Sequence, residues 1–280
     1  VQTCSLPILM ELLREMLSYP FIVRALTGGL LISLCASLLG VSLVLKRYSM
    51  IGDGLSHVSF GALSVAVAFG WAPLAVSIPV VAAAAVLLLR ITGNGKIKSD
   101  AAIAMISAGS LAVGIIVTSL TTGMTTDVSS YMFGSILAMS REDVVLSAVL
   151  SLIVLGMFIL CYNKVFAVTF DESFARATGV RVSGYNTILA VLTAVTIVLG
   201  MRMMGAMLIS SLIIFPALTS MRVFKSFSGV ILSAGTVSVV CFFIGLVLSY
   251  VYSIPAGASV VVVNMGAFGI FSVIQAVRRR

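Results

Sequence analysis

The feature that most constrains this sequence is a series of long apolar runs separated by short polar segments. A helix needs about 20 mainly apolar residues to cross the hydrocarbon core of a bilayer. Within lipid, only helices and closed barrels satisfy their own backbone hydrogen bonds. The runs predict nine membrane-spanning helices, at residues 21–45, 49–70, 72–89, 101–121, 143–162, 185–201, 203–221, 227–252 and 256–277.

Composition supports a membrane environment for nearly the whole chain. Of the 280 residues, 60% are hydrophobic and 9% are charged, and the mean hydropathy is +1.22. A soluble domain of this length would expose a largely apolar surface at that composition. We therefore expect one all-α polytopic domain over residues 20–280, in contact with membrane lipid and without a separate soluble catalytic domain.

The basic residues predict the orientation of the spans, because Lys and Arg accumulate on the cytoplasmic side. With the N-terminus outside and the C-terminus inside, 13 of the 17 Lys and Arg residues fall in cytoplasmic segments. Their scatter between apolar runs, without interleaved aromatic residues, excludes a nucleic-acid partner as the reason for the net charge of +8. The thirteen residues are Lys46, Arg47, Arg90, Lys96, Lys98, Lys164, Arg176, Arg181, Arg222, Lys225, Arg278, Arg279 and Arg280.

Residues 1–19 predict an amphipathic helix on the membrane surface. Apolar side chains occupy one face of residues 8–17, and charged side chains occupy the other. No basic segment with a short apolar core and a small-residue cleavage site follows the start, so we expect no removable signal peptide. The four cysteines lie far apart without a C-x-x-C pair, which indicates core packing rather than disulfides or a thiolate metal site.

Asp53 and His57 are the pair that most strongly indicates chemistry within a span. His57 is the only histidine, and in a helix it lies one turn from Asp53 on the same face. Ionisable groups at membrane depth cost roughly 2.5 kcal/mol or more unless they face partners or water. Carboxylate and imidazole suit zinc, manganese or iron(II), so one interpretation is a metal relay. The structural alternative pairs Asp53 with Lys46 or Arg47 and lets His57 bond a backbone carbonyl.

The predicted inner loop at about residues 163–184 has the pattern of a short amphipathic cytoplasmic helix. Phe170, Phe174 and Ala177 share one face, acidic residues stand at the start, and Gly179 is a typical C-cap. Such a helix can dock into a groove of a partner protein. A plain surface helix remains the alternative interpretation.

Pro216 and the longest outer loop suggest two further features. Pro216 lies inside the run 203–221, where it frees a backbone carbonyl and predicts a helix kink. The outer loop contains Thr126–Asp127 and Phe133–Ser135, where short helices or a re-entrant segment would line an entrance. A solvated loop carboxylate is the simpler interpretation of Asp127.

Five segments in series resemble the integral-membrane permease family of bacterial ABC importers for zinc, manganese and iron(II). The likeness covers nearly the whole chain from about residue 20. The segments are Met50–Asp53 with Ser56–His57, Ser130–Leu137, Asp171–Glu172 with Ala175 and Gly179, Met204–Leu208 running to Phe215–Ala217, and Ile254–Ala258.

The resemblance implies an assembly of two permease subunits, two cytoplasmic ATPases and an extracytoplasmic metal-binding protein. By its motifs, Asp53 and His57 are implied to contact the metal in transit. Asp171, Glu172, Ala175 and Gly179 are implied to form the segment that couples to the ATPase. The permease then binds no permanent cofactor and is not an enzyme; its cargo is Zn²⁺ or Mn²⁺, with Fe²⁺ as a further option. The expected location is the bacterial cell membrane, and a homodimer is the expected permease pair.

Two other functions remain alternatives at this stage. An ion-coupled secondary transporter would need no ATPase, but Asp53 is the only acid expected within a span. An ABC permease for a siderophore or cobalamin would need a wide cavity and has no use for direct metal ligands. A membrane enzyme is the weakest alternative, because the chain has one histidine and no H-E-x-x-H motif.

Overall fold

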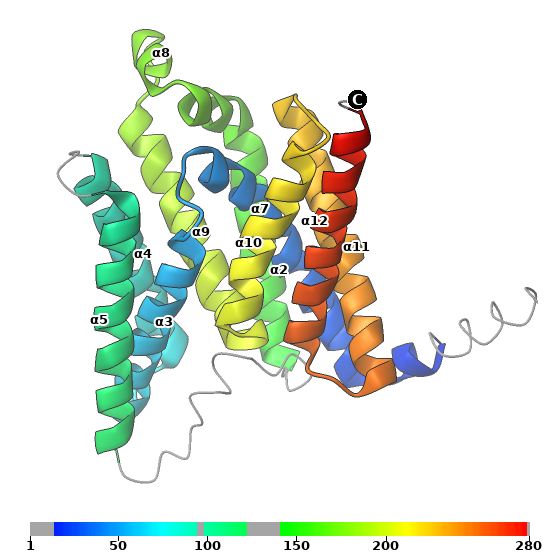
Figure 1. Cartoon of the computed structure of the whole chain (residues 1–280). Coiled ribbons are helices and arrows are strands. Elements are labelled where there is room, and N and C mark those ends of the chain that lie inside the picture. The colour runs from blue at the N-terminus through cyan, green and yellow to red at the C-terminus, as the bar shows by residue number, and fades with distance from the viewer. Residues whose placement is uncertain (1–13, 94–97, 122–140, 279–280) are drawn as a thin grey trace, which may run out of the picture.

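A computed structural model describes residues 14–93, 98–121 and 141–278 as a bundle of helices, without strands in those ranges (Figure 1). Most of the predicted N-terminal surface helix and the outer loop around Asp127 lie outside the described residues. The helices are α2 (Pro20–Leu45), α3 (Ile51–Ala68), α4 (Pro73–Gly93), α5 (Ser99–Leu120), α7 (Arg141–Phe170), α8 (Glu172–Ala177), α9 (Val182–Met204), α10 (Ala206–Met221), α11 (Phe227–Tyr252) and α12 (Ala256–Arg278).

The nine predicted spans all correspond to helices. Within the described residues, eight helices are long and apolar enough to cross a membrane, and α10 is a shorter apolar helix of 16 residues. α10 is short because Gly205, with φ +86° and ψ 160°, separates it from α9. Only glycine adopts that backbone conformation readily, so the chain turns from α9 into α10 within one residue.

The predicted boundary of the inner loop was wrong at its start. We expected the span 143–162 to be followed by a loop, whereas α7 continues to Phe170. Asn163 and Lys164 end the apolar run without ending the helix, because both are compatible with helical backbone. Only α8 and short connections separate α7 from α9, which begins at Val182.

The bundle has helices that are mostly buried and helices that are mostly exposed. In the most apolar window of each helix, 72% of α3 and of α9 is buried, against 17% of α5 and 11% of α12. α2, α9 and α10 pack against one another in the main core. The apolar outer faces of α5 and α12 are those expected of helices that contact lipid or another subunit.

Glycines allow close helix contacts at some positions in the bundle and not at others. A Cβ on Gly29 would collide with Phe242 of α11, and one on Gly114 would meet Phe60 of α3 at 2.6 Å. By contrast, a Cβ on Gly109, Gly266 or Gly269 would meet nothing within 4 Å. Helices therefore pack closely against each other at Gly29 and Gly114.

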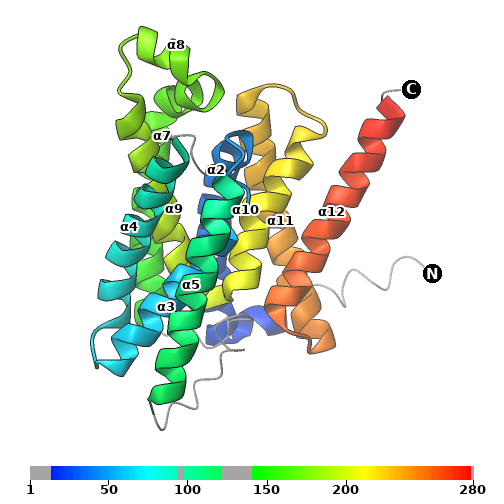
Figure 2. The ribbon, with the colours of Figure 1, turned by 60° about the vertical axis from the view of Figure 1, so that its left-hand side comes forward.

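One end of the bundle carries α8, the C-terminal end of α12 and the connection between α10 and α11 (Figures 1 and 2). α2 also ends there, because Lys46, which follows it, forms an ion pair with Glu172 of α8. Arg222, after α10, donates a hydrogen bond to Gln275 of α12 at this end. Basic residues from several predicted inner segments thus gather on one side of the bundle.

Candidate functional site

The Asp53–His57 pair lies in the first two turns of α3. His57 Nε2 is 3.7 Å from Asp53 Oδ2, which confirms that the two side chains share a helical face. The Asp53 side chain is 47% exposed and that of His57 is 17% exposed. A carboxylate in the first turn of a helix is stabilised by the helix dipole, and its exposed side leaves room for a cation.

Neighbouring glycines bring α3 close to the helices on either side of the pair. A Cβ on Gly52 would meet Ile213 of α10 at 3.0 Å, and one on Gly54 would meet Ile103 of α5 at 2.5 Å. The first turns of α3 therefore pack between α10 and α5. Asp53 is therefore half-exposed in a part of α3 that packs closely against two other helices.

One structural alternative for Asp53 was an ion pair with Lys46. The structure does not contain that ion pair. Lys46 Nζ bonds to Glu172 Oε1 and to the side chain of Asn186 instead. Asp53 therefore has His57 as its ion-pair partner among the residues that the structure describes. The Asp53 carboxylate is therefore not bonded to Lys46, the basic residue shortly before α3.

The described residues of one chain do not form a complete metal site. Within the described ranges, no group of three or more His, Cys, Asp or Glu side chains could hold a metal ion. Cys35, Cys161 and Cys241 are unpaired thiols, and Cys35 and Cys241 are buried, in agreement with the packing role expected for them. Asp53 and His57 provide two ligands, whereas zinc usually takes four.

Helix α8 has both of its predicted ends. The side chain of Asp171 accepts hydrogen bonds from the backbone N–H groups of Ser173 and Phe174, both at 2.9 Å, as an N-cap does. After the helix, Gly179 has φ +82° and its N–H donates to Arg176 O, while Val180 N–H donates to Ala175 O. This pair of bonds is a Schellman motif, which ends helices at glycine.

The two faces of α8 differ in exposure. Ala175 is fully buried and packs in a small apolar cluster with Val168 of α7 and Val182 of α9. Phe174, the residue before it, is 63% exposed. The short helix is thus anchored to the bundle by Ala175 and also presents an exposed aromatic side chain.

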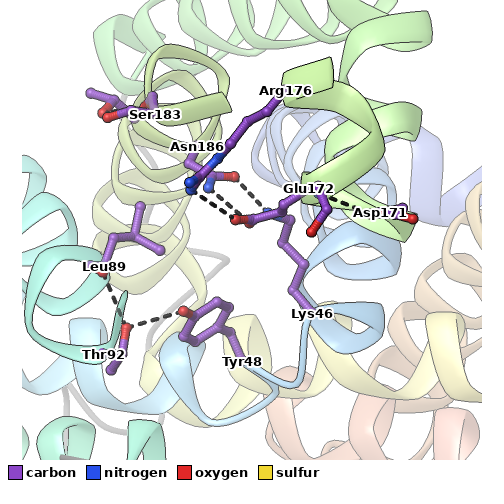
Figure 3. Close-up of polar contacts among 11 residues, drawn as sticks. Lys46, Tyr48, Leu89, Thr92, Asp171, Glu172, Arg176, Ser183 and Asn186 are labelled. Atoms are coloured by element: carbon purple, nitrogen blue, oxygen red, sulfur yellow. Dashed lines mark hydrogen bonds and ion pairs between the residues drawn. The ribbon is translucent and has the colours of Figure 1, made fainter. Parts of the chain in front are cut away.

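A polar cluster behind α8 was not predicted from the sequence (Figure 3). Lys46 Nζ lies 2.8 Å from Glu172 Oε1 and 2.6 Å from Asn186 Oδ1, and Asn186 Nδ2 donates to Glu172 Oε1 at 3.0 Å. Burial alone would raise the pKa of Glu172, but the bonds from Lys46 and Asn186 and the charges of Lys46 and Arg176 lower it below its ordinary value. Nothing local in the sequence indicates this cluster, because its members come from three segments.

The other candidate features are only partly described. Pro216 lies inside α10, as predicted; the kink it would cause remains a prediction. Residues 130–137, one of the five segments that carry the family resemblance, fall outside the described residues, as does the candidate entrance in the outer loop.

An apolar bundle in which eight of the described helices are long enough to cross a membrane defines a polytopic membrane protein. The sequence matches the ABC 3 transport family over residues 18–275, and the chain belongs to that family.

Named relatives and a solved structure extend over nearly the whole chain. The high-affinity zinc uptake system membrane protein ZnuB of Haemophilus influenzae is 28% identical over 244 residues, which are 87% of this chain and 94% of ZnuB. The manganese import system permease protein ScaB of Streptococcus gordonii is 28% identical over 254 residues, 91% of each chain. In the structure of PsaBC from Streptococcus pneumoniae in complex with Fab, the matched chain aligns with a TM-score of 0.84 and 27% identity, covering 94% of this chain and 95% of that one.

Proposed function

We propose that this chain is the permease subunit of an ABC importer that moves Zn²⁺ or Mn²⁺, or Fe²⁺ as a third cargo, into the cytoplasm. The proposal rests on the Asp53–His57 pair. The pair lies on α3 of an otherwise apolar bundle, and its carboxylate is half-exposed. Membership of the ABC 3 transport family and the zinc and manganese relatives support the class of cargo. The ion is a substrate in transit, and no permanent cofactor is required.

A second copy of the chain would complete the site. A two-fold dimer with α3 near its axis would bring together two Asp53–His57 pairs and so offer four ligands. The 47% exposure of Asp53 supports a site that faces outward from the single subunit. Ligation shared between two chains suits transport, because an ion held too firmly would not leave.

Within this site the chain's residues bind and release the ion. The Asp53 carboxylate offsets the charge of the cation, and the neutral His57 imidazole donates a lone pair to it. Metal ligands must be deprotonated, so cation and proton compete for both groups. The preference among zinc, manganese and iron(II) is not encoded by these two ligand types alone.

The energy source is a separate cytoplasmic ATP-binding subunit that docks on α8, and an extracytoplasmic metal-binding protein delivers the ion to the opposite end. The exposed Phe174 and the capped ends of α8 support the docking assignment. The basic residues at the α8 end support the orientation with the N-terminus outside and the C-terminus inside. Asp171, Glu172, Ala175 and Gly179 then shape the coupling helix, and residues 20–280 form the permease domain.

The test is ATP-dependent metal accumulation in vesicles that hold this chain with its ATPase and binding protein. We expect elemental analysis to show Zn or Mn uptake by the wild type, and loss of that uptake in Asp53→Ala and His57→Ala. Asp100→Ala is the matched control, because Asp100 is an exposed carboxylate in the first turn of α5. Normal uptake in both pair variants, with the complex intact, would refute the assignment.

A further inference from the structure

We propose that Lys46 is a positioning residue that couples movement of α8 to α3, the helix that carries Asp53 and His57. The inference rests on the proposed function, because it takes α8 as the contact with the ATPase and α3 as the contact with the metal. It names the link between these two elements.

The first observation is the closed triangle of bonds among Lys46, Glu172 and Asn186 (Figure 3). Each of the three side chains bonds to both of the others, at 2.6 to 3.0 Å. The Lys46 side chain is only 8% exposed, so its charge is not free to be solvated elsewhere. A displacement of α8 must therefore carry Lys46 with it or break a buried charge-assisted bond.

The second observation is the construction of the corner between α2 and α3, residues 46–50. Arg47 has φ +63°, a left-handed conformation that is strained for arginine. The corner is closed by bonds from Tyr48 N–H to Leu43 O at 2.9 Å and from Ile51 N–H to Tyr48 O at 3.1 Å. A segment this tightly bonded moves as a unit, so a pull on Lys46 reaches the first turn of α3 and Asp53.

The third observation is a fixed point on the other side of the corner. The hydroxyl of Tyr48 lies 3.0 Å from the hydroxyl of Thr92 near the end of α4. Lys46 and Tyr48 thus hold the corner between two different partners, α8 with α9 on one side and α4 on the other. Because Tyr48 is held at α4, a movement of α8 relative to α4 would rotate residues 46–50 rather than shift them as a whole.

Other polar contacts at this end do not provide the same link. Arg176 is 3.9 Å from Glu172 but belongs to α8 itself. Arg222 joins α10 to α12 through Gln275 and the ring of Phe268. Among the ion pairs of the described residues, the pair between Lys46 and Glu172 joins α8 to a different segment of the chain, whereas the other two pairs each lie within one helix.

The experiment measures metal uptake per ATP hydrolysed by the complete transporter in vesicles. Lys46→Met removes the buried partner and leaves Glu172, whose side chain is 44% exposed, free to be hydrated. The variant should therefore fold. We expect ATP hydrolysis to persist while uptake per ATP falls by about tenfold or more, the size of a typical coupling between sites.

Two further variants separate coupling from simple damage. Lys164→Met removes an exposed lysine near the C-terminal end of α7. This variant should leave the metal uptake per ATP hydrolysed unchanged. The reversed pair Lys46→Glu/Glu172→Lys should restore the ratio, because the Asn186 amide can bond to either charge. A purely structural role would lower ATP hydrolysis and uptake together.

The outcomes distinguish this inference from the function on which it rests. Suppose that the wild type takes up metal. The role of Lys46 alone would then be overturned if Lys46→Met left the uptake per ATP unchanged, or if the reversed pair did not restore it. Should Lys46→Met not assemble, a folded reversed pair with a lowered ratio would also overturn it. No metal uptake by the wild type would overturn the proposed function and this inference with it.

Discussion

The Asp53–His57 pair and the Lys46–Glu172–Asn186 cluster are built in opposite ways. The pair has two ionisable groups 3.7 Å apart, with the carboxylate half-exposed. The cluster has each member bonded to the other two, around a lysine that is 8% exposed. Within the single chain, the Asp53 carboxylate keeps an exposed side, whereas the three members of the cluster satisfy one another.

The difference matches the tasks proposed for the two regions. A transport site has to exchange its ion, so spare coordination at Asp53 is useful and costs the fold little. A mechanical link has to survive each cycle, so its polar groups are satisfied internally, and a satisfied buried network rigidifies the parts it joins. Stability and transport should therefore respond differently to substitutions in the two regions.

The largest stability effect should come from Glu172→Ala, compared with Asp53→Ala. Removing Glu172 leaves the buried Lys46 ammonium without its anion, which should cost about 1 to 3 kcal/mol. Removing the half-exposed Asp53 should change stability by no more than about 0.5 kcal/mol. Thermal unfolding of the purified chain in detergent measures both, and a larger loss in Asp53→Ala would reverse the comparison.

A smaller effect is expected at the C-terminal end of α8. Gly179→Ala places a Cβ on a residue with φ +82°, which should cost about 1 kcal/mol and loosen the helix. Hydrogen exchange of residues 171–180 should become faster. Gly184→Ala is the matched control, since Gly184 lies in α9 and its added Cβ would meet only Arg181 Cβ at 3.9 Å. Unchanged exchange in Gly179→Ala would show that the cap does not fix α8.

Much of the fold follows from local patterns in the sequence. The apolar runs located all nine bundle helices, and Asp171 and Gly179 marked the ends of α8 because caps act within one turn. The i, i+4 spacing placed Asp53 beside His57 for the same reason. The end of α7 was missed because Asn163 and Lys164 interrupt hydrophobicity rather than helix geometry.

Long-range features could not be read from the same patterns. Lys46 is separated from Glu172 by 126 residues and from Asn186 by 140, so only the folded bundle brings them together. Likewise, Gly29 and Gly109 look alike in sequence, yet an added Cβ would collide with another helix at Gly29 and would meet nothing within 4 Å at Gly109. Which face of a helix meets a neighbour depends on packing across the bundle, which no single run specifies.

The smallest effect expected is the pH dependence of the cluster. The pKa of Glu172 is lower in the folded chain than the ordinary value of 4.5. A depressed carboxyl pKa contributes stability that is fully present well above 4.5 and is lost as the pH falls through the folded value. The difference in melting temperature between the wild type and Glu172→Gln should therefore be constant from pH 7 down to about pH 6 and shrink below pH 4.5. Because Glu172→Gln retains every other carboxylate, including Asp53, that difference isolates the cluster from the Asp53–His57 pair. A difference that instead grew with acidity would mean that Glu172 is destabilised by its surroundings, and that the cluster is not the satisfied network that distinguishes it from the Asp53–His57 site.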